Sequence, residues 1–296
     1  MSATGNIEKI RSTNRSEQGF KVFVLRNEAI ELALVPALGA KVISLRNLVT
    51  GYEWMWHPPA GMRLFHNRPG DDFGASTLIG WDECIPTIAP CIWKGRVLPD
   101  HGEAWTVPWN LDPEAFDRGV LKTSLSLAVS PFRFERCIEL RGNEIYLNYQ
   151  LENLSNEPEE FLWAIHPLLP ASDGIRLQLT HETRNVLTGE EWVTALNFGA
   201  GKPACVKIFA GPLREGRAGV LDTIARDHLR FEWDTSSNQT LGLWLSRGGW
   251  NGCHHLALEP CNGAPDSLAE AAQAGRCGII PPKEKQSWKI KLILGA

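Results

Sequence analysis

The stretch EIYLNYQL, residues 144–151, carries the pattern that decides the fold of this chain. Ile145, Leu147, Tyr149 and Leu151 occupy every second position, so in an extended strand they would share one face. Such strict alternation is typical of half-buried antiparallel strands. The same period of two recurs in residues 121–129 (LKTSLSLAV), 174–180 (GIRLQLT), 240–246 (TLGLWLS) and 287–294 (SWKIKLIL).

Turn signals separate these segments, and helical signals are scarce. Residues 29–35 and 40–45 flank the sequence PALG (residues 36–39), which predicts a hairpin near the start of the chain. The best helix candidate is residues 267–274, where Ser267 and Glu270 have capping-box spacing and Gly275 supplies a stop. Many strands and few short helices predict an all-β fold, a large antiparallel β-sandwich.

The length of 296 residues suits one large sandwich, since domains usually take roughly 100–200 residues and sandwiches can be larger. The sequence shows no fixed-period repeat and no low-complexity linker. We therefore expect a loose N-terminal tail over residues 1–18 and a single β-sandwich domain over residues 19–296. Residues 55–109 are rich in Pro, Gly, Trp, His and Arg and lack periodicity. Long irregular segments in compact domains are usually functional, so we expect these loops to wall a pocket.

Composition excludes several classes of partner. Hydrophobic residues make up 43% and charged residues 22% of the chain, which is ordinary for a soluble globular protein. The net charge of -4 offers no basic surplus for a nucleic-acid backbone. No apolar run approaches the 18 or more residues of a membrane helix, and the first residues lack the apolar core of a signal peptide. Seven cysteines without a CxxC pair favour free thiols in the cytoplasm.

Four motifs hold the residues that could carry chemistry. Glu259 and His166 each follow an apolar run and precede a proline, and because proline ends a strand ladder, we expect both at strand ends on the rim of a cleft. Near neutral pH a carboxylate is a ready base and an imidazole a ready acid, which suits a reaction that moves two protons. The motifs are residues 80–86 (GWDECIP), 99–105 (PDHGEAW), 163–169 (WAIHPLL) and 256–268 (LALEPCNGAPDSL).

The order of these motifs resembles the aldose 1-epimerase (galactose mutarotase-like) superfamily. The matching parts are residues 34–45 (LVPALGAKVISL), the HG at His101, the HP at His166, the EP at Glu259 and residues 281–294 (PPKEKQSWKIKLIL). The match runs over nearly the whole chain, from about Val22 to Ile293. The resemblance implies a sandwich of two antiparallel sheets with a sugar cleft on one concave face. It also implies an isomerase that interconverts the α and β anomers of an aldose.

The resemblance also assigns roles to individual residues. Glu259 would be the general base for the anomeric hydroxyl, His166 the general acid for the ring oxygen, and His101 would hold a sugar hydroxyl or the ring oxygen. No metal or cofactor is implied, because a hemiacetal opens by proton transfer alone. The expected partner is a small-molecule sugar or sugar phosphate, bound by a monomer or homodimer. The sugar-binding aspartate of the family has no clear counterpart, and Asp82 and Asp173 are the candidates.

Further binding candidates adjoin the motifs. Arg63 and Arg96 flank the irregular segment, and a guanidinium group could grip sugar hydroxyls or a phosphate. Each could equally be a plain surface arginine. Trp81 and Trp163, together with Trp105, could stack on the apolar face of a pyranose or serve as core aromatics.

Three other functions stay open. One is a non-catalytic carbohydrate-binding or regulatory module on the same fold. Another is a lyase or hydrolase; a hydrolase would need a second carboxylate about 5–9.5 Å from Glu259, for which the loop candidates are Glu103, Asp82 and Glu83. The third is a metal enzyme. His255 and Glu259 lie four residues apart, roughly 13 Å along a strand, too far for one zinc, but a site that mixes His101 and His166 is not excluded.

Overall fold

Two large antiparallel sheets form the body of the protein. The computed structural model describes residues 10–196 and 203–296. Neighbouring strands of the ten-stranded sheet are, in order, β1 (Arg11–Glu17), β2 (Phe20–Arg26), β3 (Ile30–Val35), β4 (Lys41–Asn47), β5 (Trp81–Cys84), β13 (Ala164–Pro167), β20 (Cys253–Cys261), β19 (Thr240–Trp250) and β16 (Ala204–Ala210), with β14 (Leu169–Pro170) paired to β20. The eight-stranded sheet has the order β15 (Ile175–Leu179), β17 (Arg217–Asp222), β18 (Asp227–Trp233), β22 (Lys285–Gly295), β11 (Glu144–Asn153), β10 (Phe132–Arg141), β9 (Val120–Ser126) and β8 (Asn110–Leu111).

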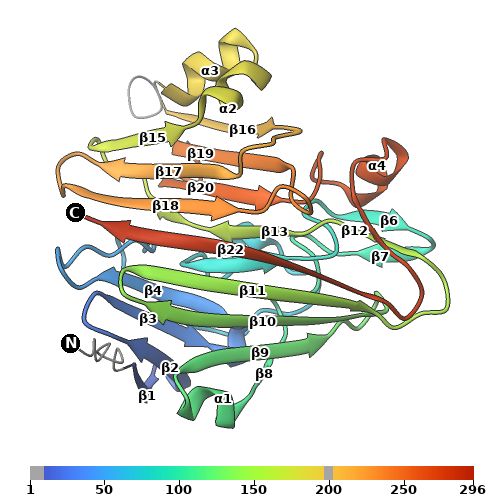
Figure 1. Ribbon diagram of the computed structural model, residues 1–296, viewed down its shortest axis with the longest axis horizontal. Coiled ribbons are helices and arrows are strands. Elements are labelled where there is room, and N and C mark those ends of the chain that lie inside the picture. Colours follow the sequence, from blue (N-terminus) through green and yellow to red (C-terminus); the bar gives the residue numbers. More distant parts are fainter. Residues whose placement is uncertain (1–9, 197–202) are drawn as a thin grey trace, which may run out of the picture.

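The remaining elements are short and lie around the sheets (Figure 1). Two small ladders pair β6 (Cys91–Trp93) with β7 (Arg96–Leu98), and β12 (Glu159–Phe161) with β21 (Gly278–Ile280). The helices are α1 (Pro113–Asp117), α2 (His181–Val186), α3 (Gly189–Leu196) and α4 (Leu268–Gln273), with 3-10 turns η1 (Pro36–Leu38) and η2 (Phe73–Ala75). No helix in the described part of the chain is both long and apolar enough to cross a membrane.

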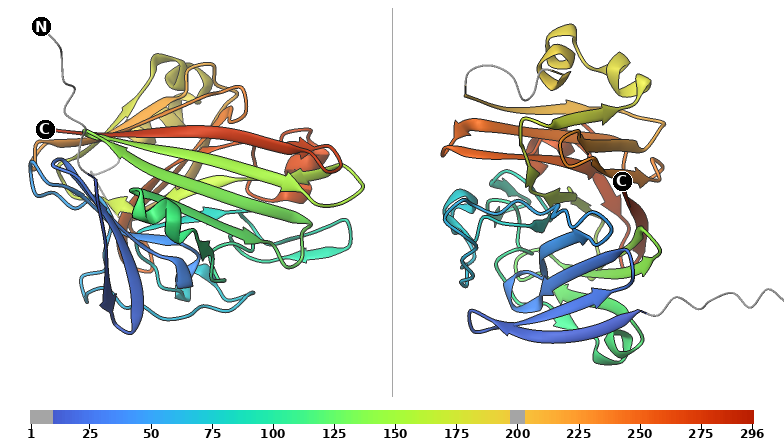
Figure 2. Two further views of the ribbon diagram at one scale, coloured as in Figure 1. Left: turned by 60° about the horizontal axis from the view of Figure 1, so that its bottom comes forward. Right: turned by 90° about the vertical axis from the view of Figure 1, so that its left-hand side faces the viewer.

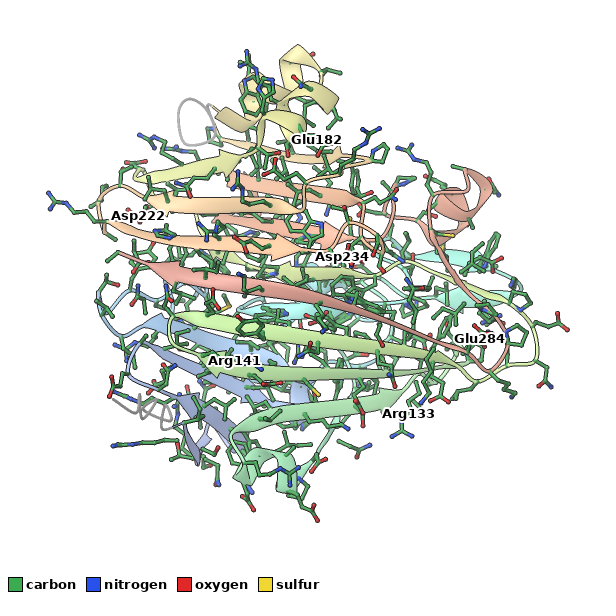
Figure 3. All side chains as sticks on the ribbon, viewed as in Figure 1. Arg133, Arg141, Glu182, Asp222, Asp234 and Glu284 are labelled. Atoms are coloured by element: carbon green, nitrogen blue, oxygen red, sulfur yellow. The ribbon has the colours of Figure 1, made fainter. Side chains whose placement is uncertain are left out.

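The core lies between the two large sheets, which Figure 2 shows as separate layers. In β11 the residues at every second position, Ile145, Leu147 and Leu151 among them, are buried, as their alternation predicts. On β10 the burial alternates in the same way, and the exposed Arg133 and Arg141 lie on the solvent side (Figure 3). The hydrophobic effect therefore holds the sheets face to face, with the polar half of each strand in water.

The predicted all-β sandwich is confirmed, and so are its main elements. Each of the five alternating segments lies on a strand, and β3 and β4 form the predicted antiparallel hairpin through η1. The predicted N-cap of α4 is also present, since the Ser267 side chain accepts a hydrogen bond from the backbone N–H of Glu270. Helices α1, α2 and α3 were not predicted.

The N-terminal prediction needs a correction. Residues 1–9 of the predicted tail lie outside the described residues, but Arg11–Glu17 forms β1, which pairs with β2 from Arg11↔Arg26 to Glu17↔Phe20. The expectation of a loose tail is wrong for this strand. Its sequence, RSTNRSE, shows no apolar alternation because β1 lies at the edge of the sheet with mostly exposed side chains. Backbone hydrogen bonds, which leave no sequence signature, hold it in place.

The ten-stranded sheet buries one face in the core and turns the other toward the irregular segment. In β20, Leu256 and Leu258 point into the core, so His255 and Glu259 share the opposite face. The predicted placement of Glu259 at a strand end is wrong, because Pro260 and the following Cys261 still pair with β19. On its other side β20 pairs with β13 only at Cys261, so the ladder there is nearly absent and tolerates a proline.

Candidate active site

A cavity of about 330 Å³ lies on the face of the ten-stranded sheet that points away from the core. Its floor comes from β13, β16, β19 and β20, and its walls come from the irregular segment and the loop before α4. This agrees with the prediction that residues 55–109 wall a pocket. The lining residues are Asp72, Phe73, Gly74, Leu78, Ile88, Ala89, Pro90, Asp100, His101, His166, Leu168, Lys207, Trp244, Trp250, His255 and Asp266.

His166 lines this cavity, and the fully buried Glu259 lies directly beside His166 without lining the cavity itself. The His166 Nε2 atom lies 3.6 Å from Glu259 Oε1, and both side chains are almost fully buried. Neither Glu259 Oε1 nor His166 Nδ1 has a hydrogen-bond partner among the described residues. Buried polar atoms are nearly always paired, so an unpaired oxygen and an unpaired nitrogen on two neighbouring side chains mark these residues as a candidate functional pair.

The second carboxylate oxygen of Glu259 has a partner that the sequence analysis missed. Lys207 on β16 donates a hydrogen bond to Glu259 Oε2, and its Nζ atom also lies 3.7 Å from Asp266 Oδ1. To reach Glu259, the lysine must cross β19, where the residue opposite Glu259 is Gly242. A Cβ atom at Gly242 would come within 3.1 Å of Glu259 Oε2. The absence of a side chain at Gly242 therefore provides the space in which Lys207 and Glu259 form their ion pair.

Burial and charge set the protonation of this group. Burial raises the pKa of Glu259, and the neighbouring Lys207 ammonium partly opposes that shift. The pKa of His166 lies well below 6.5, because of burial first and then the electrostatic effect of the neighbouring His101 and Lys207. Burial opposes the charge on Lys207, but the attraction of Glu259 and Asp266 outweighs it and raises the pKa of the lysine. The free site therefore holds a charged lysine and a neutral His166 near pH 7.

His101 lies beside His166, and its loop explains the HG motif. The two imidazole rings are 5.2 Å apart, and His101 is stacked 3.8 Å from the Phe73 ring. The Nδ1 atom of His101 forms a hydrogen bond of 2.9 Å with Asp100. Gly102 follows with a φ of +75°, and a Cβ atom there would lie 2.0 Å from the carbonyl oxygen of Ile85. Only glycine allows this close approach, which brings the imidazole to the cavity.

The other end of the cavity is aromatic. Trp244 donates a hydrogen bond of 3.3 Å from Nε1 to Nδ1 of His255, and Trp250 lies edge-on to the same imidazole at 5.7 Å. Trp56 does not line the cavity, but its ring packs edge-on against the His255 imidazole, with the ring centroids 4.8 Å apart. Burial lowers the pKa of His255 to about 4, with a smaller contribution from His254. The imidazole is therefore neutral near pH 7.

Three predicted binding residues do not line the cavity. Trp81 and Trp163 belong to the core between the sheets, where both donate hydrogen bonds to Glu83. They occupy alternate positions that point away from the cavity face, so stacking on a sugar is wrong for both. Asp82 lies on the same side of the sheet as His166, but it is buried in an ion pair with Lys41 and does not line the cavity.

The predicted arginines and the second aspartate candidate also lie elsewhere. Arg63 is exposed, and Arg96 donates two hydrogen bonds to Glu159 on β12. Asp173 is 84% exposed and pairs with Arg247. Both arginines belong to the irregular segment in sequence, but neither lines its cavity. Trp105 is buried against the His101 loop and donates a hydrogen bond to the Asp100 carbonyl oxygen.

Signals for some missed residues were present in the sequence. Lys207 is a lone charge within the apolar run VKIFA, and His255 stands four residues before Glu259, which puts both on one face of a strand. Nothing in the local sequence distinguishes Phe73 or Asp266. Among the described residues, no three His, Cys, Asp or Glu side chains are grouped so that they could hold a metal ion. All seven cysteines are free.

Comparison with protein-family models and with curated proteins finds no match to this sequence. Solved structures do match. A galactose mutarotase-like protein from Clostridium acetobutylicum is similar with a TM-score of 0.73 at 15% identity, covering 98% of this chain and 99% of that chain. The Slr1438 protein from Synechocystis sp. PCC 6803 has a TM-score of 0.70 at 18% identity, covering 100% of this chain and 98% of its own.

A galactose mutarotase related enzyme from Lactobacillus acidophilus is also similar, with a TM-score of 0.64 at 13% identity, covering 93% of this chain and 97% of that chain. At these identities the likeness establishes the fold, and it extends over almost the whole of each protein. This chain therefore has the galactose mutarotase-like β-sandwich fold, carried by a divergent sequence.

Proposed function

We propose that this protein is an aldose 1-epimerase-like isomerase that interconverts the α and β anomers of a sugar. The observation that carries the proposal is the distance of 3.6 Å between Glu259 Oε1 and Nε2 of His166, which lines the cavity. In a cyclic sugar the anomeric hydroxyl and the ring oxygen are bonded to the same carbon. A base for one and an acid for the other must therefore converge on a very small space, as these two atoms do.

The reaction needs two proton transfers and no other reagent. Glu259 takes the proton of the anomeric hydroxyl while the bond between C1 and the ring oxygen breaks, and His166 delivers a proton to that oxygen. The product is the open aldehyde. Rotation about the C1–C2 bond turns the carbonyl, and the ring closes on its other face with the two roles reversed. Each group, if well placed, contributes about 10²–10⁴-fold to the rate.

The protonation states of Glu259 and His166 decide the pH at which this chemistry can run. The lysine favours the carboxylate form of Glu259, which is the form that accepts a proton. His166 must carry a proton to act as the acid, and its lowered pKa makes that form scarce at neutral pH. We expect a bell-shaped dependence of kcat/KM on pH with its maximum on the acidic side of neutrality.

The lining favours an unphosphorylated sugar. Among the described residues, Lys207 is the cavity's only lysine or arginine, and it already pairs with Glu259 and Asp266. Asp72 and Asp100 add negative charge. A phosphate would meet no unpaired cation there. Sugar hydroxyl groups, by contrast, can donate hydrogen bonds to carboxylates and can donate to or accept from imidazoles.

A non-catalytic sugar-binding module is the second candidate. It is favoured by one observation: the ion pair with Lys207 occupies one oxygen of Glu259, so the carboxylate has a structural partner already. The hydrolase alternative loses its predicted second carboxylates, because Asp82 pairs with Lys41, Glu83 with Arg136, and Glu103 accepts hydrogen bonds from the backbone N–H groups of residues 129 and 130.

The test is NMR or polarimetry on freshly dissolved α-sugars, with and without the protein. Faster approach to anomeric equilibrium is expected, and His166→Ala should lose most of it while the circular dichroism spectrum stays unchanged. Binding of sugars without any acceleration would instead establish the module. Chelators should leave the rate unchanged, and a loss that zinc restores would contradict the metal-free mechanism.

A further inference from the structure

We propose that Asp100 is a positioning residue, which fixes the tautomer of His101 so that the Nε2 atom of this imidazole presents a lone pair, a hydrogen-bond acceptor, at the cavity. This rests on the proposed function, because it gives His101 a defined part in orienting the reacting sugar. It also decides between the two roles, holding a hydroxyl or holding the ring oxygen, that the sequence left open for His101.

The carboxylate of Asp100 connects two parts of the cavity wall. Its Oδ1 atom lies 2.9 Å from Nδ1 of His101, and its Oδ2 atom accepts a hydrogen bond of 3.1 Å from the backbone N–H of Phe73. The Phe73 ring in turn stacks on the His101 imidazole, with an angle of 9° between the ring planes. One carboxylate therefore holds both the imidazole and the residue that packs on it, and all three residues line the cavity.

The charge on Asp100 defines the tautomer of His101. Burial opposes ionisation of Asp100, but the hydrogen bonds from His101 and from the Phe73 backbone outweigh it and lower the pKa of this carboxyl below its usual value. An ionised carboxylate can only accept hydrogen bonds, so Nδ1 of His101 must donate. In the neutral imidazole the single proton then lies on Nδ1, and Nε2 carries a lone pair.

The backbone holds this pair in a conformation that residues with a side chain rarely adopt. His101 has a φ of +55°, in the left-handed region that favours glycine. Its N–H donates a hydrogen bond of 2.6 Å to the Ile88 carbonyl oxygen, and the Asp100 carbonyl oxygen accepts one of 2.8 Å from the Trp105 indole. Strained residues of this kind persist where the surroundings enforce them, and they cluster at functional sites. The loop therefore keeps the carboxylate and the imidazole together at the cavity.

The lone pair on Nε2 limits what His101 can bind. The ring oxygen of a sugar has no proton to donate, so neutral His101 in this tautomer cannot form a hydrogen bond with it. A sugar hydroxyl can donate to Nε2. His101 therefore holds a hydroxyl, and the ring oxygen is left to His166, whose imidazole lies 5.2 Å from that of His101. A hydroxyl fixed at this place orients the sugar ring toward its acid.

The experiment reads the tautomer by long-range proton–nitrogen NMR, which distinguishes a protonated ring nitrogen from an unprotonated one. Spectra are recorded on the alkaline side of neutrality, and the His101 signals are those missing from His101→Gln. In the parent protein Nδ1 should carry the proton. In Asp100→Asn the carboxamide oxygen should stay on the fixed Phe73 N–H donor and its NH2 group should face His101, so the proton should move to Nε2.

Asp100→Asn should also lose about tenfold in kcat/KM for anomer exchange, because Nε2 then meets the sugar hydroxyl as a donor instead of an acceptor. Asp100→Ala gives a second variant, in which His101 should populate both tautomers. The matched control is Asp112→Asn, which changes an aspartate that also accepts a backbone N–H, from Ala115, but does not line the cavity. Its spectrum and its rate should match those of the parent.

A parent protein with the proton on Nε2, or an Asp100→Asn protein with an unchanged tautomer, overturns the tautomer assignment. A switched tautomer without loss of rate overturns the positioning role of Asp100. Because the tautomer is read without turnover, the expected tautomers in a protein that does not accelerate anomer exchange would refute the proposed function and support the assignment of Asp100 and His101.

Discussion

Glu83 and Glu259 are both completely buried glutamates beside a cation, yet their surroundings differ in one respect. Glu83 lies between the sheets and accepts four hydrogen bonds, from Arg136, Tyr149, Trp81 and Trp163. Glu259 lies beside His166 and Lys207, two residues that line the cavity, and accepts one hydrogen bond from Lys207, while its Oε1 atom has no hydrogen-bond partner among the described residues.

The difference separates a structural carboxylate from a candidate catalytic one. A buried charge is tolerated when its oxygens are satisfied, and the four donors around Glu83 meet that condition. A buried oxygen left unsatisfied beside a cavity and an imidazole costs stability, and a ligand can relieve that cost. The number of donors on each carboxylate therefore predicts which substitution affects activity and which affects folding.

The largest expected effect is on the rate. Glu259→Gln keeps the shape of the side chain but removes the base, so anomer exchange should fall by about 10²–10⁴-fold. The melting temperature should change little by comparison, because the carboxylate that is lost was only half satisfied. Polarimetry and thermal unfolding on the same sample measure both. Full activity in this variant would remove Glu259 from the mechanism.

Glu83→Gln should show the opposite result. It leaves the fully buried Arg136 without its counter-charge, which should lower the free energy of unfolding by about 3–5 kcal/mol. Urea unfolding followed by tryptophan fluorescence measures the loss. Whatever fraction stays folded should keep a normal kcat, since Glu83 does not line the cavity. A stable but inactive Glu83→Gln protein would contradict the distinction between the two carboxylates.

A smaller effect is expected when the cation is removed from the cavity. Lys207→Met takes away the charge that lowers the pKa of Glu259 and also the charge that lowers the pKa of His166, so both pKa values should rise. The ascending limb of the rate profile follows ionisation of Glu259, and the descending limb follows deprotonation of His166. Both limbs should therefore move to higher pH.

The control for this shift is Lys94→Met, which removes a partly exposed lysine that pairs with Glu160 and does not line the cavity. Its profile of kcat/KM against pH should match that of the parent protein. If Lys207→Met left both limbs in place, the electrostatic role of the lysine would be wrong, and its ion pair with Glu259 would be purely structural.

The comparison also shows what the sequence could predict. Alternation of apolar residues predicted the sandwich, because the pattern of a strand records which face is buried. The proline after an apolar run marked Glu259 and His166, although β20 continues past Pro260. Asp82 stood in another of the four motifs, without a proline after it, and is paired with Lys41, because the neighbours of a side chain come from distant strands.

Lys207 and His255 show the other limit. Each becomes informative only through a contact across strands, Lys207 with Glu259 and His255 with Trp244. The register of β16, β19 and β20 creates these contacts, and the apolar alternation of one strand tells which face is buried but does not name the residue that lies opposite on the next strand. The tryptophans illustrate the same point, since Trp163 adjoins a motif but packs in the core, while Trp250 adjoins none and lines the cavity.

The smallest expected effect concerns the wall of the cavity. Phe73 in η2 stacks on His101 and meets His166 edge-on at 5.3 Å, so Phe73→Leu removes the ring that holds both imidazoles in place. The loss of such ring contacts corresponds to about 0.5–1.5 kcal/mol, or roughly two- to tenfold in rate. If Phe73 positions the acid, kcat should fall more than KM rises. A change in KM alone would mean that the ring only binds sugar, and the positioning of His166 would then depend on its strand rather than on the loop above it.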